Sequence, residues 1–486
     1  MVFKKIIEKY RSFPNVLKAT FWFTIASFFQ KGLSVITTPI FTRIMSTEEY
    51  GVYNLYMSWH NIFIVLCTLN LASGMLNSFL IKDEDNKDKI ISSVLGFEFF
   101  LSLIILLGYI GYTFVFGNLP GLTFKYGILM FIEIIVNIPV SIWLVKQKFS
   151  ANYKAAIIVF IQSVLITILS VVLVITLDEK AQARIYGTIL GAFMFSILCL
   201  VFIILKSKNL FDFKIWKMCL IFGGPLIFHF LAQSIMGQSD KLIIDYYYDK
   251  TETAIYSVAH SISWLLYIFI TAVNSTIIPW IYKKIKKTDY SGISNIILLV
   301  LFILSVLVLI VSMLSPELIW LFGGDNYKKG ATMIPPLAGS LLFIYITSIF
   351  TNFEFYYKKT IMTVVSTIIG AGVNVGLNFI FIPIYGPIAA CYTTLISYFI
   401  INIIHCFVLT IILRKNNEYY ISDVLNIKLI YFISLTFLVG ILLIQFIFDY
   451  LVIRILILSL SLIILVFFSY KFKKILYKRK ENIENE

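Results

Sequence analysis

Apolar stretches follow one another almost without interruption from Phe13 to Tyr470. A helix that crosses a membrane needs about 20 predominantly apolar residues. Only 14% of the 486 residues are charged and 59% are hydrophobic, whereas a soluble domain carries roughly 25% charged residues. The pattern therefore predicts an all-α integral membrane protein.

We expect about fourteen transmembrane helices, with both termini in the cytoplasm. Thirty of the 40 Lys and Arg residues then fall in cytoplasmic segments and eight in outside loops, which is the bias that the positive-inside rule describes. Arg184, the first residue of the sixth span, is counted with the outside loops. The spans are placed near 15–42, 51–80, 90–116, 121–145, 152–177, 184–205, 216–246, 253–282, 291–314, 330–357, 361–382, 385–413, 425–448 and 451–470.

Charge and cysteine usage exclude two other classes of partner. The formal net charge is +14, but the basic residues lie in short links between spans and not on one face of a soluble module, so nucleic acid is not expected. The five cysteines lie in apolar runs without a CxxC pair or a Cys/His cluster. No metal site or disulfide framework is predicted.

Two short internal matches indicate a duplicated architecture. A shift of 203 residues places Glu49–Tyr53 on Glu252–Tyr256, and a shift of 199 places Ile185–Ile189 on Ile384–Ile388. Six spans separate the members of each match, so the two halves share one orientation, as in transporters built from parallel repeats. We expect two six-helix lobes around a central cavity, at 1–205 and 206–415, followed by two additional spans and a basic cytoplasmic tail at 416–486.

The first span carries a polar stripe. Its members recur at steps of three and four residues, which places them on one helical face: Thr20, Thr24, Ser27, Lys31, Ser34 and Thr38. A lysine at the membrane centre costs about 2.5–3.5 kcal/mol on insertion scales. We therefore expect Ser27, Lys31 and Ser34 to line a cavity; the alternative is helix contact through Ser and Thr, with Lys31 paired to a buried acid.

The seventh span has a second polar group, with Gln233, Asp240 and Lys241 as further candidates for the cavity. Asp240 could instead be a structural partner of Lys241, or the pair could lie at headgroup depth. Arg43 and His60, near the outer ends of spans one and two, are candidates for gating.

Two carboxyl groups lie inside predicted spans. Glu133 is at the middle of span four and Glu98 is about two turns into span three. Protonatable carboxyl groups at this depth are candidates for coupling to an H⁺ or Na⁺ gradient. The alternative for Glu133 is a neutral side chain that is hydrogen-bonded to Asn137 or to another helix.

Four segments resemble one family of transporters. The sequence from Phe41 to Tyr53 resembles the end of the first helix and the following loop of oligosaccharide-repeat-unit flippases of the Wzx type (O-antigen and capsule), members of the multidrug/oligosaccharidyl-lipid/polysaccharide exporter superfamily. The later segments occur in the expected order and are Gly224-Pro225 with Gln238–Lys241, Leu321–Gly324, and Asn378 with Ile382–Gly386.

The resemblance implies alternating access and an undecaprenyl-diphosphate-linked oligosaccharide as cargo, in a bacterial inner or plasma membrane. It implies no cofactor, and it implies membrane lipids, a polysaccharide polymerase and glycosyltransferases as partners. A cationic cavity is expected, and Lys31 and Lys241 fit it because a diphosphate needs fixed positive charge when it leaves water.

Two other functions remain open at this stage. A cation-coupled multidrug antiporter of the same superfamily is the main alternative, and Glu98 and Glu133 favour it. A membrane glycosyltransferase or polymerase is the third, but such enzymes usually need a sizeable outside loop or an acidic catalytic motif. The sequence has neither, so we expect a transporter and not an enzyme.

Overall fold

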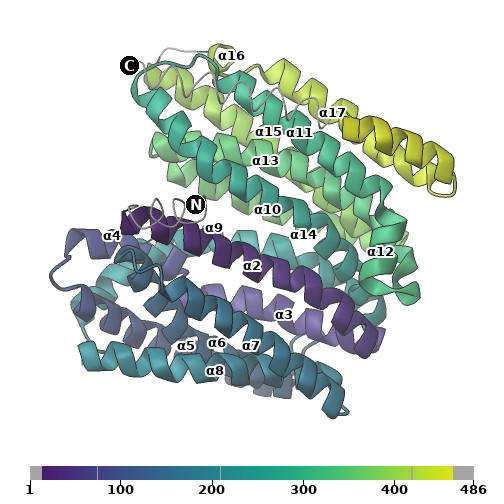
Figure 1. The fold of residues 1–486 in the computed structure, drawn as a ribbon. Coiled ribbons are helices and arrows are strands. Elements are labelled where there is room, and N and C mark those ends of the chain that lie inside the picture. Colours follow the sequence, from purple (N-terminus) through teal and green to yellow (C-terminus); the bar gives the residue numbers. More distant parts are fainter. Residues whose placement is uncertain (1–13, 74, 208, 418–419, 464–486) are drawn as a thin grey trace, which may run out of the picture. The chain divides into compact units, whose positions relative to one another are not determined.

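The chain folds into long helices that run roughly side by side within each half (Figure 1). The computed structural model describes residues 14–73, 75–207, 209–417 and 420–463, and every regular element in these ranges is helical. The long helices are α2 (Asn15–Ile44), α3 (Thr47–Thr68), α5 (Lys87–Phe116), α6 (Phe124–Phe149), α7 (Ala155–Thr176), α8 (Lys180–Lys206), α9 (Phe213–Tyr247), α10 (Lys250–Lys286), α11 (Ile293–Met313), α13 (Ile334–Tyr356), α14 (Thr360–Tyr385), α15 (Ile388–Asn417) and α17 (Ile427–Leu443).

Shorter elements join them. These are α4 (Met75–Lys82), α12 (Ser315–Gly323), α16 (Ile421–Val424), the 3₁₀ turns η1 (Leu71–Ser73), η2 (Asp325–Met333) and η3 (Ile444–Ile447), and an apolar helix over Leu451–Ile463. The expected all-α membrane fold is confirmed.

The long helices follow the predicted spans closely. Among the described residues, ten helices are long and apolar enough to cross a membrane, and α9, which bends by 53° at Pro225, makes eleven. Both α2 and α3 are long enough to cross a membrane, at 30 and 22 residues. They are not among these eleven helices because polar side chains lower their hydropathy. Span two ends at Thr68, earlier than expected, because Leu69 and Asn70 adopt left-handed backbone conformations.

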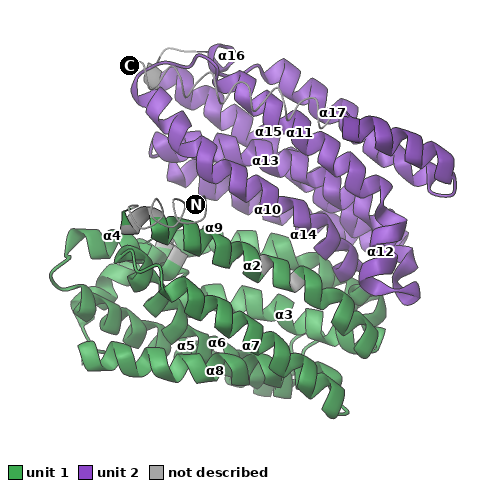
Figure 2. Ribbon diagram, in the orientation of Figure 1, with its two compact units in different colours: residues 1–254 green, residues 255–486 purple. Residues whose placement is uncertain are grey.

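The chain forms two compact units, residues 1–254 and 255–486 (Figure 2). In unit 1, α8 packs against α6 and α7, α3 against α9, and α2 against α7. In unit 2, α15 packs against α13 and α14, and α11 against α13 and α17. The boundary between the units follows α9, because this helix packs against α3 and α5 and so belongs to unit 1. The division at 205/206 and 415/416, which was based on the sequence repeats, stays a prediction.

One of the two repeat matches agrees with the helix boundaries. Glu49 and Glu252 are each the third residue of their helices, α3 and α10, which begin 203 residues apart. The match of Ile185 to Ile384 is wrong in register, because Ile185 lies inside α8 whereas Ile384 lies at the end of α14.

Glycines bring α7 and α8 into close contact. A Cβ on Gly187 would overlap the backbone of Ser170, and a Cβ on Gly191 would lie 2.8 Å from the Cα of Ile166. Small residues four apart allow helix backbones to approach closely in membranes. The α7–α8 pair therefore forms a tightly packed wall of unit 1.

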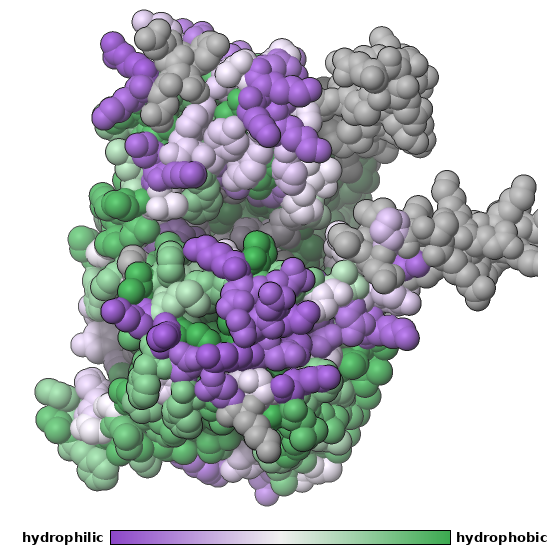
Figure 3. Space-filling model, turned by 90° about the vertical axis from the view of Figure 1, so that its left-hand side faces the viewer, coloured by the Kyte–Doolittle hydropathy of each residue, from purple (hydrophilic) through white to green (hydrophobic). Residues whose placement is uncertain are grey.

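Hydrophilic side chains gather at the end of unit 1 where α5 begins and α8 ends (Figure 3). Asp212 caps α9 by accepting hydrogen bonds from the backbone N–H groups of Lys214 (3.0 Å) and Ile215 (3.3 Å), and it lies 2.7 Å from the Lys89 ammonium. Lys89 and these backbone donors lower the pKa of Asp212 below its ordinary value, against a smaller opposing effect of burial. The capped turn joins α5 to α9 outside the apolar segments.

Candidate functional site

A polar cavity of about 270 Å³ lies between four helices of unit 1. Hydroxyl, amide and guanidinium groups contribute to its wall, with three apolar side chains and the ring of Tyr53 among them. The lining residues are Gln30, Leu33, Thr37 and Phe41 of α2, Tyr53 of α3, Ser163, Ile166, Thr167 and Ser170 of α7, and Arg184 and Thr188 of α8.

Arg184 supplies the positive charge of this cavity. Its guanidinium carbon lies 3.8 Å from the ring centroid of Phe41 and 3.7 Å from that of Tyr53. The guanidinium carbon thus lies over two aromatic rings, one from α2 and one from α3. Such stacking is favourable by about 0.5–2 kcal/mol.

Arg184, which was counted with the outside loops, is part of a helix. α8 begins at Lys180, and Arg184 lies one turn inside it. The predicted span began at Arg184 itself, four residues after the start of α8, so the sequence did not distinguish a loop position from a position inside the helix.

A cluster of three side chains in unit 1 brings together two residues singled out from the sequence, Glu133 and His60. The Tyr56 hydroxyl donates a 2.6 Å hydrogen bond to the carboxyl of Glu133, and His60 Nε2 lies 4.0 Å from the other carboxyl oxygen. All three side chains are buried. The α3 spacing of four residues places Tyr56 and His60 on the face that meets α6.

The alternative for Glu133 allowed a hydrogen bond to Asn137 or to another helix. Its side chain is hydrogen-bonded to another helix, whereas the Asn137 amide donates to the backbone carbonyl of Glu133 at 2.9 Å. The carboxyl group is therefore held by α3, and its exposure depends on the contact between α3 and α6.

Glu98 has a different environment. Its side chain is fully buried in α5, and within the described part of the chain neither carboxyl oxygen has a hydrogen-bond partner. An unpaired buried carboxylate is very costly, so the protonated form is expected. Glu98 thus differs from Glu133, which has the Tyr56 and His60 partners that Glu98 lacks.

The remaining candidates on α2 differ in their exposure. Ser27 is exposed, as are Thr20 and Thr24, whereas Thr38 is buried. The side chains of Lys31 and Ser34 lie outside the described ones. Arg43, expected to gate, is exposed and donates from Nη1 to the Pro39 carbonyl at 2.9 Å, one turn earlier on its own helix.

The candidates on α9 fall in different environments. Gln233 is exposed and Asp240 is buried. The Lys241 ammonium donates to the Gln238 side-chain oxygen at 3.3 Å.

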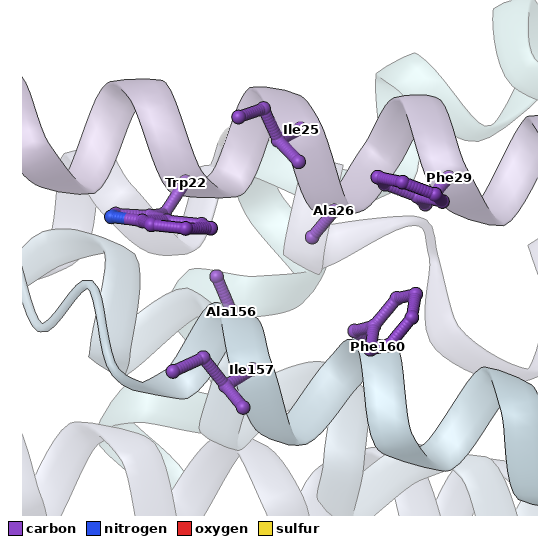
Figure 4. Close-up of a pocket in the computed structure, with 7 residues that line it drawn as sticks. All are labelled: Trp22, Ile25, Ala26, Phe29, Ala156, Ile157 and Phe160. Atoms are coloured by element: carbon purple, nitrogen blue, oxygen red, sulfur yellow. The ribbon is translucent and has the colours of Figure 1, made fainter.

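An apolar cavity lies beside the polar one along the same two helices. Figure 4 shows Trp22, Ile25, Ala26 and Phe29 of α2 facing Ala156, Ile157 and Phe160 of α7, around a volume of about 260 Å³. The lining changes from apolar to polar at Phe29 and Gln30. There Phe29 contacts Phe160 edge to face, and the Gln30 amide donates to the Ser163 hydroxyl at 3.0 Å.

Unit 2 contains a buried polar cluster that the sequence analysis missed. His405 Nδ1 lies 2.8 Å from one carboxyl oxygen of Glu354, and the Thr363 hydroxyl donates to the other at 2.6 Å. All three side chains are buried. The rule that ionisable residues inside spans deserve a functional reading could have found Glu354 and His405.

Comparison with known proteins places these features in a class. The model of the polysaccharide biosynthesis protein family matches residues 16–285, and the MatE model matches residues 225–380. Lsg locus putative protein 1 of Haemophilus influenzae is 24% identical over 406 residues, which cover 79% of this chain and 98% of that protein. An uncharacterized membrane protein of the same organism is 23% identical over 388 residues, covering 75% and 91%.

Two solved structures show the same fold. The lipid II flippase MurJ, in an inward closed conformation, matches with a TM-score of 0.70 and 20% identity over 94% of this chain and 99% of MurJ. An inward-facing MATE family multidrug resistance transporter matches with a TM-score of 0.60 and 14% identity over 81% and 96%. The fold is thus that of the transporters of the multidrug/oligosaccharidyl-lipid/polysaccharide exporter superfamily.

Within that class the family is also defined. The polysaccharide biosynthesis model matches more than half of the chain, so the protein belongs to the polysaccharide biosynthesis protein family. The relationship indicated by the sequence segments is confirmed, and the protein is a multi-pass membrane transporter.

Proposed function

We propose that this protein is a flippase that moves an undecaprenyl-diphosphate-linked oligosaccharide repeat unit from the cytoplasmic to the outer leaflet of a bacterial plasma membrane. The observation that carries the proposal is the match of the polysaccharide biosynthesis family to residues 16–285. A transporter in such a pathway must move a glycan that is assembled on a lipid carrier inside the cell.

The chemistry of α2 supports this cargo. One stretch of the helix lines an apolar cavity and the next lines a polar one. Lys31 lies on the polar stripe of the same helix. A lipid-linked diphosphate presents an apolar chain and a dehydrated anion, and an ammonium group can replace part of the water that the anion loses.

Alternating access needs bodies that move without unfolding, and each unit has a buried core of its own. In unit 1 the core includes Leu76, Val94 and Ile142, and in unit 2 it includes Leu341, Phe350 and Leu409. We propose that both termini are cytoplasmic, that no cofactor or covalent chemistry is needed, and that a polymerase and glycosyltransferases act on the same glycan.

Complementation of a deletion strain tests the proposal. The deletion should accumulate lipid-linked repeat units and lose surface polysaccharide, and the wild-type gene should restore it. Lys31→Arg should retain much of this activity and Lys31→Ala should not, with both variants inserted at near-normal levels. Normal polysaccharide in the deletion strain, with no accumulated lipid-linked intermediate, would contradict the proposal.

The second candidate is a cation-coupled multidrug antiporter. The MatE match to residues 225–380 favours it, and the Tyr56–Glu133–His60 group could bind the coupling proton. Altered dye efflux with normal surface glycans would support this function. Glycosyl transfer by the purified protein would instead show an enzyme.

A further inference from the structure

The apolar cavity between α2 and α7 has the dimensions of a groove for one hydrocarbon chain. It has a volume of about 260 Å³, and Figure 4 shows side chains of the two helices facing each other across it, from Trp22 at one end to Phe29 at the other. A helical rise of about 10 Å separates these two residues. One leaflet contributes about half of the roughly 30 Å hydrocarbon core, so the groove accommodates much of one acyl chain.

Contacts between the helices bound the groove at its Phe29 end. The rings of Phe29 and Phe160 meet edge to face with their centroids 5.3 Å apart, and the Gln30 amide donates to the Ser163 hydroxyl at 3.0 Å. A chain that follows the groove from Trp22 stops at these contacts. The acyl chain of a phospholipid is as long as one leaflet is thick and fits this limit, whereas a polyisoprenyl chain is longer and would fit only if the contacts opened.

Three lysines lie at the other end of the groove. Lys18 precedes Trp22 by one turn of α2, which places both residues on one helical face. Lys154 is the N-cap residue of α7. Lys148, near the end of α6, holds its ammonium 5.6 Å from the centroid of the Phe23 ring on α2. Positive charge therefore reaches this end of the groove from three helices.

No acidic residue of these segments offsets the positive charge. The sequence contains no Asp or Glu from Pro14 to Ile44 or from Lys146 to Leu177. Ammonium groups form charge-assisted hydrogen bonds with phosphate oxygens, and each basic residue near a membrane surface strengthens the binding of an anionic lipid about fivefold. A zwitterionic lipid would bring a positive group to the same lysines. This end of the groove therefore favours a lipid with a net negative charge.

We propose that the groove binds an anionic glycerophospholipid, such as phosphatidylglycerol, with one acyl chain between α2 and α7 and its phosphate beside the lysines. Ala26 and Ala156 line the groove and leave room for the chain, because a larger side chain at either position would fill it. The lipid completes the packing of α2 on α7. In the proposed topology this end of α2 is cytoplasmic, so the lipid comes from the cytoplasmic leaflet; the choice of leaflet rests on that topology.

Fluorescence quenching by brominated lipids tests the site, because Trp22 lines the groove. The purified full-length protein is reconstituted in phosphatidylcholine vesicles that contain increasing mole fractions of phosphatidylglycerol or phosphatidylcholine with brominated acyl chains. Subtracting the signal of Trp22→Phe isolates Trp22 from the other tryptophans. We expect brominated phosphatidylglycerol to quench Trp22 half-maximally at a mole fraction at least fivefold lower than brominated phosphatidylcholine. Equal quenching by the two lipids would show contact with bulk lipid only and would overturn the proposal.

Variants place the binding in this groove. Lys154→Gln removes one exposed charge and should reduce the preference for phosphatidylglycerol about threefold to fivefold. Ala156→Leu should abolish the preference, because the larger side chain occupies the groove. Lys82→Gln is the matched control, since Lys82 is also an exposed lysine of a predicted cytoplasmic segment and lies over the Phe222 ring at 5.1 Å, outside the groove. This variant should keep the full preference.

Each result has a defined meaning. A preference that is unchanged in Lys154→Gln, or reduced equally in Lys82→Gln, would refute the assignment to the groove, and Lys154→Gln decides alone if Ala156→Leu does not fold. Undecaprenyl phosphate at the same mole fraction should leave the quenching unchanged, and displacement of the brominated lipid would assign the groove to the lipid carrier instead. None of these measurements involves transport, so a negative result would overturn the inference and leave the proposed function intact.

Discussion

The hydrogen bond between Tyr56 and Glu133 gives a quantitative test of how α3 and α6 are joined. Tyr56→Phe removes a 2.6 Å hydrogen bond to a carboxyl that is 7% exposed. A hydrogen bond to a charged group contributes about 1.5–3 kcal/mol, and one between neutral groups about 0.5–1.5 kcal/mol. The size of the loss therefore reports whether Glu133 is ionised.

A double-mutant cycle isolates this term. Tyr56→Phe, Glu133→Met and the double variant are unfolded reversibly with SDS in mixed micelles, and tryptophan fluorescence gives the free energies of unfolding. We expect a coupling energy of about 1.5–3 kcal/mol at pH 8 if Glu133 is charged. A neutral Glu133 would instead give a coupling energy of about 0.5–1.5 kcal/mol.

The chain supplies a matched control for the tyrosine change. Tyr109 is also buried in unit 1, but its hydroxyl has no hydrogen-bond partner among the described residues. Tyr109→Phe should therefore leave the free energy of unfolding unchanged or raise it slightly. A coupling energy near zero for Tyr56 and Glu133, or an equal loss from Tyr109→Phe, would refute the reasoning.

Four further outcomes are expected. Glu98→Met should raise the free energy of unfolding by about 1–3 kcal/mol, because it removes a buried carboxyl without a hydrogen-bond partner. Reduced stability would show that the carboxyl has a partner. In transport assays, Glu98→Gln should slow transport less than Glu133→Gln. Because the pKa of Asp212 is lowered, its ionised carboxyl contributes to stability above the ordinary Asp pKa near 4, and this contribution is lost as the pH falls through the lowered pKa. In thermal unfolding, Asp212→Asn should therefore destabilise the protein at pH 7 but not at pH 2. An equal effect at both pH values would contradict the ion pair. Cysteines introduced at Lys125 and Lys328 should react with a membrane-impermeant reagent added from outside, whereas cysteines at Lys154 and Lys286 should not. A reversed pattern would exclude the proposed topology.

The succession of helices could be predicted from the sequence because each span must satisfy its own backbone hydrogen bonds in lipid. The positions of α5, α7 and α11 follow directly from apolar length. The end of α3 could not be placed, since Leu69 and Asn70 leave the helix within an apolar run that continues to residue 80. Hydropathy does not encode a left-handed backbone turn.

The candidate site was predicted less well, because its groups meet across helices. Glu133 and His60 were each identified by depth, but their proximity depends on how α3 packs on α6. Arg184 was counted as a loop residue because the predicted span began only at this position, four residues after the start of α8. Its stacking on Phe41 and Tyr53 requires three helices at fixed spacing, which no local pattern specifies.

The glycine contact between α7 and α8 has a consequence for interpreting variants. Any residue larger than glycine at position 187 would meet the backbone of Ser170, and backbone cannot move aside as a flexible side chain can. Loss of function at Gly187 or Gly191 would accompany loss of inserted protein. In a saturation mutagenesis screen scored only by polysaccharide, these positions would rank with those of the cargo site. Scoring protein abundance in parallel would separate them, since a change such as Lys31→Ala should lower transport without lowering abundance.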